Sequence, residues 1–317
     1  MSDISRLVDR PNRPEQQVDD SAARPGRSQS PPPSRPRGST RAIGVARFAP
    51  SRIGGFSTLT VLAVISIYPF VWMVLTSLRD RNTVFTGPFI PEHFKFGAYP
   101  DAWRETNFGL HLRNTIVIAG LSLLGIMVLS TTAGYAFAKL RFPFKRTIYI
   151  LLLSTLAMPA TALVIPLYLQ VKRLGLLDTT LGLILVYIGS MSPFSIFLMR
   201  AFFATLPDDL IEAARLDGAG ELTIFRKVML PLAKAGVGTV VILQFLSLWN
   251  EFLYANVLLQ DPNKHPLQPV VFNLVGQFST PWNLLTAALT MAIVPIVIVY
   301  VRMQKRFASG LMLGAIK

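Results

Sequence analysis

The sequence of 317 residues contains no cysteine, only three histidines and few charged residues. Without cysteine it forms neither a disulfide framework nor a thiolate metal site. His93, His111 and His265 lie far apart, in predicted loops or at a helix edge, and make a poor metal site. Charged residues make up 15% of the chain, against about 25% in soluble domains. This deficit, with a hydrophobic content of 51% and a mean hydropathy of +0.46, indicates a protein of the lipid bilayer.

The net charge of +14 is distributed in a way that argues against nucleic acid as a partner. Ten arginines precede Gly54, and the other basic residues gather in connectors between apolar runs. Binding of nucleic acid calls for a folded basic surface with interleaved aromatic side chains, and the sequence shows none. Basic connectors are instead typical of a protein whose positive charges set its orientation in a membrane.

Six apolar runs are long enough to cross a bilayer, since about 20 apolar residues in a helix span ~30 Å of hydrocarbon. An all-α, polytopic membrane fold with six transmembrane helices is therefore predicted. The predicted spans cover residues 56–78, 115–137, 147–169, 181–203, 235–258 and 284–301.

The prolines inside the spans and the aromatic residues of one loop each allow more than one interpretation. Pro159 and Pro166 in the third span and Pro193 in the fourth are either ordinary kinks or the sign of a packed, kinked pathway. The aromatic residues of the loop at 79–111 either lie at the level of the lipid headgroups or form a docking surface for an external partner.

Counts of Lys and Arg predict that both termini are cytoplasmic. The N-terminal tail has ten Lys and Arg residues, the connector at 139–146 has four, the stretch at 200–234 has five and the C-terminal tail has four. The connectors on the opposite side of the membrane have only four, two and one. Residues 1–50, rich in Arg, Pro, Ser and Asp, are predicted to form a disordered cytoplasmic tail and not a secretory signal. Residues 51–303 are assigned to the six-span domain and residues 304–317 to a cytoplasmic tail.

The most polar interruption between spans, residues 208–227, has five acidic and three basic residues and must lie in water. Pro207 suits the first turn of a helix, and Asp208 and Asp209 follow at the positive end of the helix dipole. Gly218 can adopt the left-handed backbone that ends a helix. A helix is therefore predicted between Pro207 and Gly218.

One face of this predicted helix carries two alanines, whose small side chains would let another chain approach closely. A second short helix is predicted at residues 223–228, ended by Leu230-Pro231. From these residues alone the stretch is either a plain connector or a docking element. The face is formed at helical spacing by Leu210, Ala213, Ala214 and Asp217.

The same stretch carries a motif. Glu212-Ala213-Ala214, three residues, Gly218, nine residues and then Val228-Met229-Leu230-Pro231 resembles the EAA loop of the membrane subunits of bacterial ABC importers. The family pattern is Glu-Ala-Ala, three residues, Gly, nine residues and Ile-x-Leu-Pro. The chain departs from it only in having Val228 in place of isoleucine.

More broadly, residues 147–317, and more loosely the chain from Phe56, resemble the carbohydrate-uptake branch of that family, in particular the maltose-type second permease subunit. The chain departs from the branch at Ala235, often a proline, and before Leu267, where threonine is common. The motifs that carry the resemblance are Met158-Pro159, Ile165-Pro166-Leu167-Tyr168, Leu174-Gly175-Leu176, Pro193-Phe194, Leu216-Asp217-Gly218-Ala219, Trp249-Asn250-Glu251-Phe252 and the ending from Gly310 through Gly314 to Lys317.

The resemblance implies a type I ABC importer permease fold in the bacterial cytoplasmic (inner) membrane, and a chain that is not an enzyme. It implies four kinds of partner: a second, similar permease subunit, two ATP-binding subunits, an extracytoplasmic solute-binding protein and the lipid bilayer. The chain has no G-x-x-x-x-G-K-[ST] phosphate loop, so we expect no bound cofactor and expect the ATPase subunits to use the ATP. The loop at 204–234 is expected to dock on the ATPase through Glu212, Ala213, Ala214, Asp217, Gly218, Leu230 and Pro231.

Two further sets of residues are candidates. Trp249, Asn250 and Glu251 lie in the fifth predicted span, where they either line a translocation path for a sugar or make polar contacts between helices. By the resemblance, Gly310 and Gly314 belong to a C-terminal segment that reaches the ATPase; a frayed terminus is the alternative.

Import of a sugar or related carbohydrate is therefore the expected function. The first alternative is a permease for another solute class on the same machinery. The second is an ion-coupled carrier that works alone, which usually has several intramembrane acids, whereas Glu251 is the only acid in a predicted span.

Overall fold

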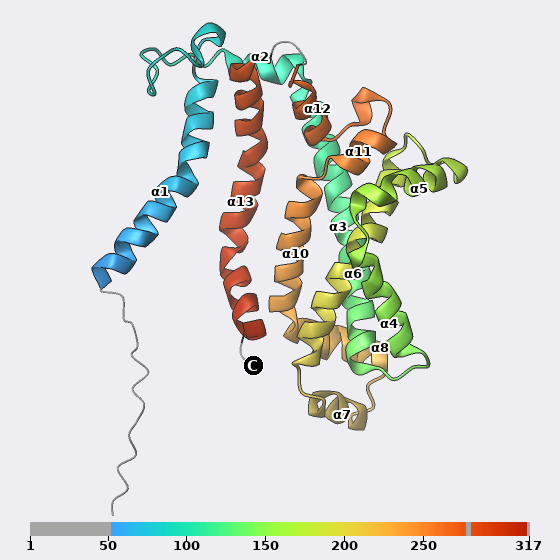
Figure 1. The fold of residues 1–317 in the computed structure, drawn as a ribbon. Coiled ribbons are helices and arrows are strands. Elements are labelled where there is room, and N and C mark those ends of the chain that lie inside the picture. Colours follow the sequence, from blue (N-terminus) through green and yellow to red (C-terminus); the bar gives the residue numbers. More distant parts are fainter. Residues whose placement is uncertain (1–51, 277–279, 316–317) are drawn as a thin grey trace, which may run out of the picture. The chain divides into compact units, whose positions relative to one another are not determined.

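The computed structural model describes residues 52–276 and 280–315, and the tail assigned to residues 1–50 falls outside them. In the described ranges the chain is helical without any β-strand, which confirms the predicted all-α class. Residues 56–317 form one compact unit. Its helices are α1 (Arg52–Ser77), α2 (Ala98–Glu105), α3 (Phe108–Lys139), α4 (Lys145–Ser154), α5 (Ala160–Arg173), α6 (Thr180–Ala204), α7 (Asp209–Leu216), α8 (Glu221–Thr223), the π-helix η3 (Ile224–Met229), α9 (Leu230–Leu232), α10 (Lys234–Trp249), α11 (Leu253–Leu258), α12 (Leu267–Asn273) and α13 (Trp282–Ala315), with short 3-10 turns η1 (Arg81–Thr83), η2 (Thr155–Ala157) and η4 (Pro262–Lys264) (Figure 1).

Four straight helices are long and apolar enough to cross a membrane, at Gly55–Ser77, Phe108–Lys139, Thr180–Ala204 and Trp282–Gln304. They coincide with the first, second, fourth and sixth predicted spans. Two bent helix pairs raise the number of candidate spans to as many as six. The last straight helix continues through the predicted C-terminal tail as far as Ala315.

The third predicted span is not one straight helix. Its two halves, Lys145–Ala157 and Ala160–Arg173, meet at an angle of 107°. Met158 between them is extended, at φ −85° and ψ 122°, because a residue before proline is pushed out of the helical region. Pro159 therefore breaks the span, whereas Pro166 and Pro193 remain inside α5 and α6.

The fifth span was predicted to end at residue 258, and this was wrong. The α10 helix ends at Trp249 after 16 residues, which rise about 24 Å, and α11 is a separate helix. At its other end, α10 meets the segment Glu221–Leu232 at 76°. The break after Trp249 falls on Asn250 and Glu251, where a helix would otherwise carry a carboxylate into hydrocarbon.

The core is built on α3, which packs along α6, with α10 against both. At Gly134, α3 comes so close to α6 that a Cβ would lie 2.7 Å from the Cβ of Met199. Near this point lies a group of buried side chains that we call the loop-end cluster. Its members are Tyr135, Met199, Phe203, Ile211, Ile224, Phe225, Met229, Ala233 and Val240.

Candidate coupling site

The α7 helix lies past the ends of α3 and α6 (Figure 1). It begins at Asp209, after Asp208, so Pro207, which was predicted in the first turn of the helix, lies just before it. After it, Gly218 has φ +81°, which confirms the predicted left-handed residue. The N–H of Gly218 donates to the carbonyl of Arg215 at 3.0 Å, and the N–H of Ala219 donates to that of Ala214 at 2.9 Å. These two bonds end the helix and turn the chain toward α8.

One side of α7 is anchored in the protein. Ile211, 4% exposed, belongs to the loop-end cluster with Phe203 of α6 and Ile224 of η3, and Ala214 packs against that cluster. The four-residue face predicted from the spacing is therefore divided: Ala214 points inward, whereas Ala213 and Asp217 are exposed. The prediction placed both alanines on the docking surface, but the spacing alone did not show that α7 packs on α6 and η3.

Polar contacts fix the same helix to the bundle. Lys139, the last residue of α3, donates to the Asp208 carboxylate and to the Leu206 carbonyl, both at 2.6 Å. Its hydrogen bond and positive charge hold the pKa of Asp208 below its usual range. Arg215 pairs with Glu221 at 2.6 Å, and this hydrogen bond raises the pKa of the arginine. The hydroxyl of Tyr135 donates to the other Glu221 oxygen at 3.2 Å.

The second loop helix is longer than predicted. It begins at Glu221 instead of Thr223, and it runs through Leu230 and Pro231 as far as Leu232. Its middle, Ile224–Met229, is a π-helix, and Pro231 follows in the first turn of the next α-helical segment. The helix ends at Leu232, one residue after Pro231, so the end predicted at Leu230-Pro231 is correct to within one residue.

The free side of α7 presents apolar and acidic side chains. Leu216 is 90% exposed, Leu210 is 39% exposed, and Ala213 and Glu212 are exposed beside them. Glu212 lines a cavity of about 740 Å³ together with Arg141, which lies in the turn after α3. An anchored helix with an exposed apolar ridge, outside the spans, is suited to docking on another protein.

Of the expected path residues, Trp249 lies inside the bundle. It is 2% exposed, clusters with Phe108 and Leu267, and its indole N–H donates to the carbonyl of Ala292 in α13 at 3.2 Å. In this structure the ring offers no platform to a solute, because tertiary packing covers it. Asn250 is exposed and donates to the Leu246 carbonyl at 2.8 Å.

Glu251 makes the polar contacts between helices that were the alternative to path lining. Its carboxylate accepts the N–H groups of Tyr254 at 2.8 Å and Ala255 at 3.2 Å. It also accepts the hydroxyl of Tyr187 from α6. The carboxylate thus satisfies the free N–H groups at the start of α11, where the helix dipole favours negative charge.

Replacing Glu251 by alanine is expected to lower the thermal stability of the purified protein by several degrees. The change leaves two N–H groups and the Tyr187 hydroxyl without their acceptor, at a cost of about 1–3 kcal/mol. Asn250→Ala, one residue earlier, serves as the control because it removes only an exposed bond. Equal melting temperatures for the two variants would show that the cap is dispensable.

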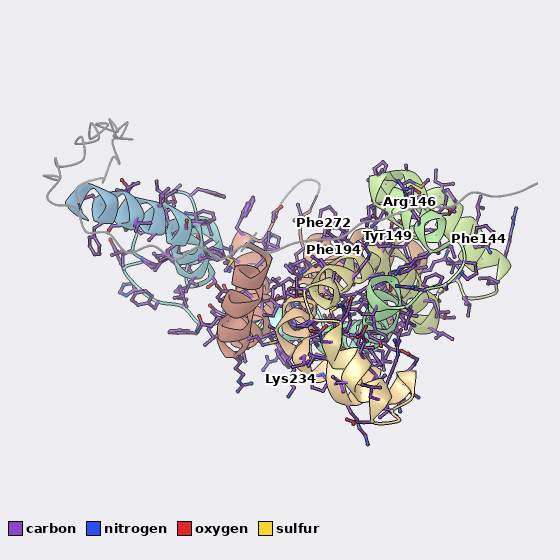
Figure 2. The ribbon with its side chains drawn as sticks, turned by 90° about the horizontal axis from the view of Figure 1, so that it is seen from below. Phe144, Arg146, Tyr149, Phe194, Lys234 and Phe272 are labelled. Carbon is purple, nitrogen blue, oxygen red and sulfur yellow. The ribbon has the colours of Figure 1, made fainter. Side chains whose placement is uncertain are left out.

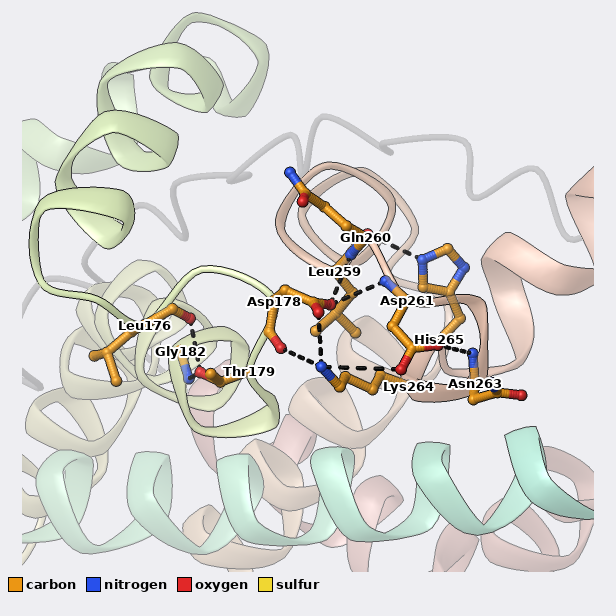
Figure 3. A network of polar contacts seen from close by, with 10 residues as sticks. All are labelled: Leu176, Asp178, Thr179, Gly182, Leu259, Gln260, Asp261, Asn263, Lys264 and His265. Atoms are coloured by element: carbon orange, nitrogen blue, oxygen red, sulfur yellow. Dashed lines mark hydrogen bonds and ion pairs between the residues drawn. The ribbon is translucent and has the colours of Figure 1, made fainter.

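A second polar network joins the α5–α6 turn to the segment after α11 (Figure 3). Asp178 accepts the N–H groups of Gln260 at 2.9 Å and Asp261 at 3.0 Å and pairs with Lys264 at 2.6 Å. The Asp261 N–H, then Lys264 and the Gln260 N–H, lower the pKa of Asp178 to about 2. Since a free carboxyl has a pKa of about 3.9, this stabilisation is complete above that pH and is lost as the pH falls through about 2.

Two of the three histidines hold segments together through backbone carbonyls. His111 of α3 bonds the carbonyl of His265 at 2.8 Å, and His265 bonds that of Leu259 at 3.0 Å. Among the described residues, no group of three His, Asp or Glu side chains is placed to hold a metal ion. The expected ATPase contacts Gly310 and Gly314 lie in the last turns of α13, and their surroundings lie outside the described side chains.

Comparison with known families decides the class. Residues 126–312, which include the whole loop from α7 to α9, match the binding-protein-dependent transport system inner membrane component family. The chain belongs to this family. Its members are multi-pass membrane components of transport systems and not enzymes, as the EAA resemblance implied.

Individual relatives of this transport component match about four fifths of the chain. The diacetylchitobiose uptake system permease protein of Streptomyces coelicolor is 35% identical over 82% of this chain and 87% of its own length. The trehalose transport system permease protein of Mycobacterium tuberculosis is 35% identical over 81% and 95%. One chain of a solved bacterial ABC transporter involved in the import of alginate is 29% identical to this chain. The match covers 80% of this chain and 95% of the transporter chain, and the two superpose with a TM-score of 0.72. The type of fold implied by the resemblance is thus confirmed.

The ion pairs that join distant segments of the permease were not predicted from the sequence. Lys139 and Asp208 pair across 69 positions, and Asp178 and Lys264 across 86. One signal was available for the first pair: a lysine ends one span, and an acidic pair starts the exposed loop helix. For the second pair the sequence offered no comparable signal, because the left-handed backbone of Asp178 is not marked by glycine.

Proposed function

We propose that this chain is the membrane-spanning permease subunit of an ATP-driven importer for a sugar or sugar oligomer. Two relatives are named for diacetylchitobiose and trehalose, and the structural neighbour comes from a transporter of a polysaccharide. The observation that carries the proposal is α7, whose outer side is exposed while Ile211 fixes its inner side in the bundle.

In this mechanism the exposed side of α7 docks on an ATP-binding subunit. Glu212 offers a carboxylate to a basic residue of that subunit, Ala213 allows close approach, and Leu216 supplies apolar contact. Ala214 and Leu230 support the helix through the loop-end cluster, Pro231 lies exposed near the end of the second loop helix, and Gly218 sets the angle between α7 and α8. Because α7, α6 and η3 share the loop-end cluster, a displacement of the docked helix moves the spans with it. ATP is bound by the partner subunits, and this chain needs no cofactor.

The proposed assembly contains a second, homologous permease subunit, two ATP-binding subunits and an extracytoplasmic solute-binding protein. It lies in the bacterial inner membrane with both termini of this chain in the cytoplasm, in agreement with the basic residues at 139–146 and 200–234. The α7 helix then faces the ATPase side.

The test is reconstitution of the complex in proteoliposomes with the partner subunits encoded beside this chain. The co-purified binding protein is screened against sugars, sugar oligomers and amino acids, and uptake of the bound ligand is measured with and without ATP. Sugar binding and ATP-dependent uptake are expected. Binding of amino acids alone refutes the solute class, and uptake by the single chain without ATP refutes the mechanism.

Charge reversal of Glu212 to lysine is expected to reduce uptake about tenfold or more while the chain stays in the membrane. A like charge at a docking contact costs on the order of 1–3 kcal/mol. Uptake and ATP hydrolysis are measured on the same proteoliposomes. Asp101→Lys is the matched control, since Asp101 is likewise exposed in the first turn of an eight-residue helix, α2. Equal uptake in the two variants would leave Glu212 without a coupling role.

A further inference from the structure

The turn between α3 and α4 gathers basic side chains that have no acidic partner. We call Arg141, Lys145, Arg146 and Arg200 the basic turn; the first three lie in or directly after the turn, and Arg200 reaches it from α6. None of the four forms an ion pair within the described part of the chain. Lys139 differs, because Asp208 neutralises it at 2.6 Å.

Three of these cations, Arg141, Lys145 and Arg200, lie close to one another, and uncharged groups hold two of them in place. The Arg200 guanidinium donates to the Phe137 carbonyl at 3.3 Å and lies over the ring of Tyr149, 4.4 Å from its centroid. The Lys145 ammonium donates to the Leu140 carbonyl at 2.7 Å and lies within range of the positive charges of Arg141 and Arg200. Like charges in such proximity repel one another, so an anion at this place would be bound favourably.

The acids nearest to the basic turn do not supply that anion. Asp208, Glu212 and Glu221 line the same cavity as Arg141 and Lys145. Asp208 is paired with Lys139 and Glu221 with Arg215. Glu212 forms no ion pair among the described residues and belongs to the exposed side of α7. The basic turn therefore keeps its positive charge in this structure.

The surface beside the basic turn is apolar. The α4 helix has no buried residue, and Ile148, Ile150 and Leu151 are exposed along it. Phe144 at its start is 77% exposed, and Figure 2 labels it with Arg146 and Tyr149 at this part of the molecule. A cationic group at the end of an exposed apolar helix matches the two parts of a lipid, a charged headgroup and acyl chains.

We propose that the basic turn binds the phosphate headgroup of an anionic phospholipid whose acyl chains lie along α4. Clusters of basic residues at the end of a membrane helix attract anionic lipid, and a guanidinium fork suits phosphate. In the proposed orientation of the chain this lipid lies in the cytoplasmic leaflet, and that placement rests on the proposed function. The binding of the lipid by the basic turn does not depend on it.

The test uses the assembled transporter in nanodiscs of phosphatidylcholine with increasing phosphatidylglycerol, and native mass spectrometry measures the phosphatidylglycerol retained. The double variant Arg141→Gln with Lys145→Gln is expected to retain it about 30-fold more weakly, from the usual contribution of a basic residue near an anionic surface. Arg146→Gln alone, an exposed side chain, should weaken retention about fivefold. Lys172→Gln with Arg173→Gln removes the same charge from the exposed end of α5 and should change nothing.

Equal retention in the wild type and in both basic-turn variants overturns the proposal. Release of the lipid by millimolar inorganic phosphate overturns it in favour of a free-anion site. Loss of the second permease subunit from the Arg141→Gln, Lys145→Gln complex assigns this surface to a subunit contact and also overturns it. Sugar uptake by the wild type is scored separately, so a failed transport assay and a failed lipid assay are distinguishable.

Discussion

Gly218→Pro is expected to abolish solute uptake by the assembled transporter, to less than about 1% of wild type, while the chain still inserts and basal ATP hydrolysis continues. Gly218 has φ +81°, whereas proline is fixed near −65°. The substitution also removes the N–H that donates to Arg215 at the end of α7. Because α7 and α8 then meet at a different angle, a docked ATPase subunit can no longer move the spans. Uptake and ATP hydrolysis in proteoliposomes measure the loss.

Gly220 provides the matched control for this prediction. It lies two residues later in an extended conformation, at φ −73° and ψ 160°, and a Cβ at this position would meet open space. Gly220→Ala should therefore transport normally. Gly218→Ala should fall between the two, since a Cβ there also meets no atom and only the left-handed backbone costs about 1 kcal/mol. Normal uptake by Gly218→Pro would show that the loop is a plain connector.

Structural features that are set by residues close together in the sequence were predicted from it. The four straight spans follow from apolar runs alone, because the length of hydrocarbon fixes the length of helix. The end of α7 follows from a single glycine, since few other residues adopt φ near +80°. The charged stretch was placed outside the spans because charges are costly in hydrocarbon.

The two broken spans could not be placed from composition. The spans predicted at 147–169 and 235–258 include their breaks, because average hydropathy does not detect a bend. At Pro159 the steric rule for the residue before a proline was a usable signal, although Pro166 and Pro193 show that a proline alone does not decide a break. At Glu251 the signal was the carboxylate itself, which ends the apolar run where a helix start can solvate it.

The sequence also did not show which side chains are buried by packing against other helices. Trp249 was predicted either to line a path or to make polar contacts between helices, and its indole N–H finds an acceptor at Ala292 in α13. Ala213 and Ala214 are adjacent and chemically identical, yet one is exposed and the other packs against the loop-end cluster. Which of them faces outward depends on where Ile211 is buried, and that depends on α6 and η3.

Ile211→Asp is expected to abolish uptake, because Ile211 anchors α7 to the bundle. Ile211 is 4% exposed among apolar side chains, and a carboxylate there loses the packing of the isoleucine and is desolvated. The combined cost is about 3–5 kcal/mol or more, so α7 is expected to leave the cluster. Uptake should fall to background, and the melting temperature of the purified chain should fall with it.

Leu216→Asp separates anchoring from docking on the same helix. Leu216 is 90% exposed, so an aspartate there removes no contact within the chain and should leave its melting temperature unchanged. Uptake should nevertheless fall, because the apolar contact offered to the ATPase subunit is lost. Ile211→Asp thus affects stability and uptake, and Leu216→Asp affects uptake alone. If Ile211→Asp lowered stability yet transported normally, motion would not pass from α7 into the spans through the loop-end cluster, and the covalent connections to α6 and α8 would have to carry it.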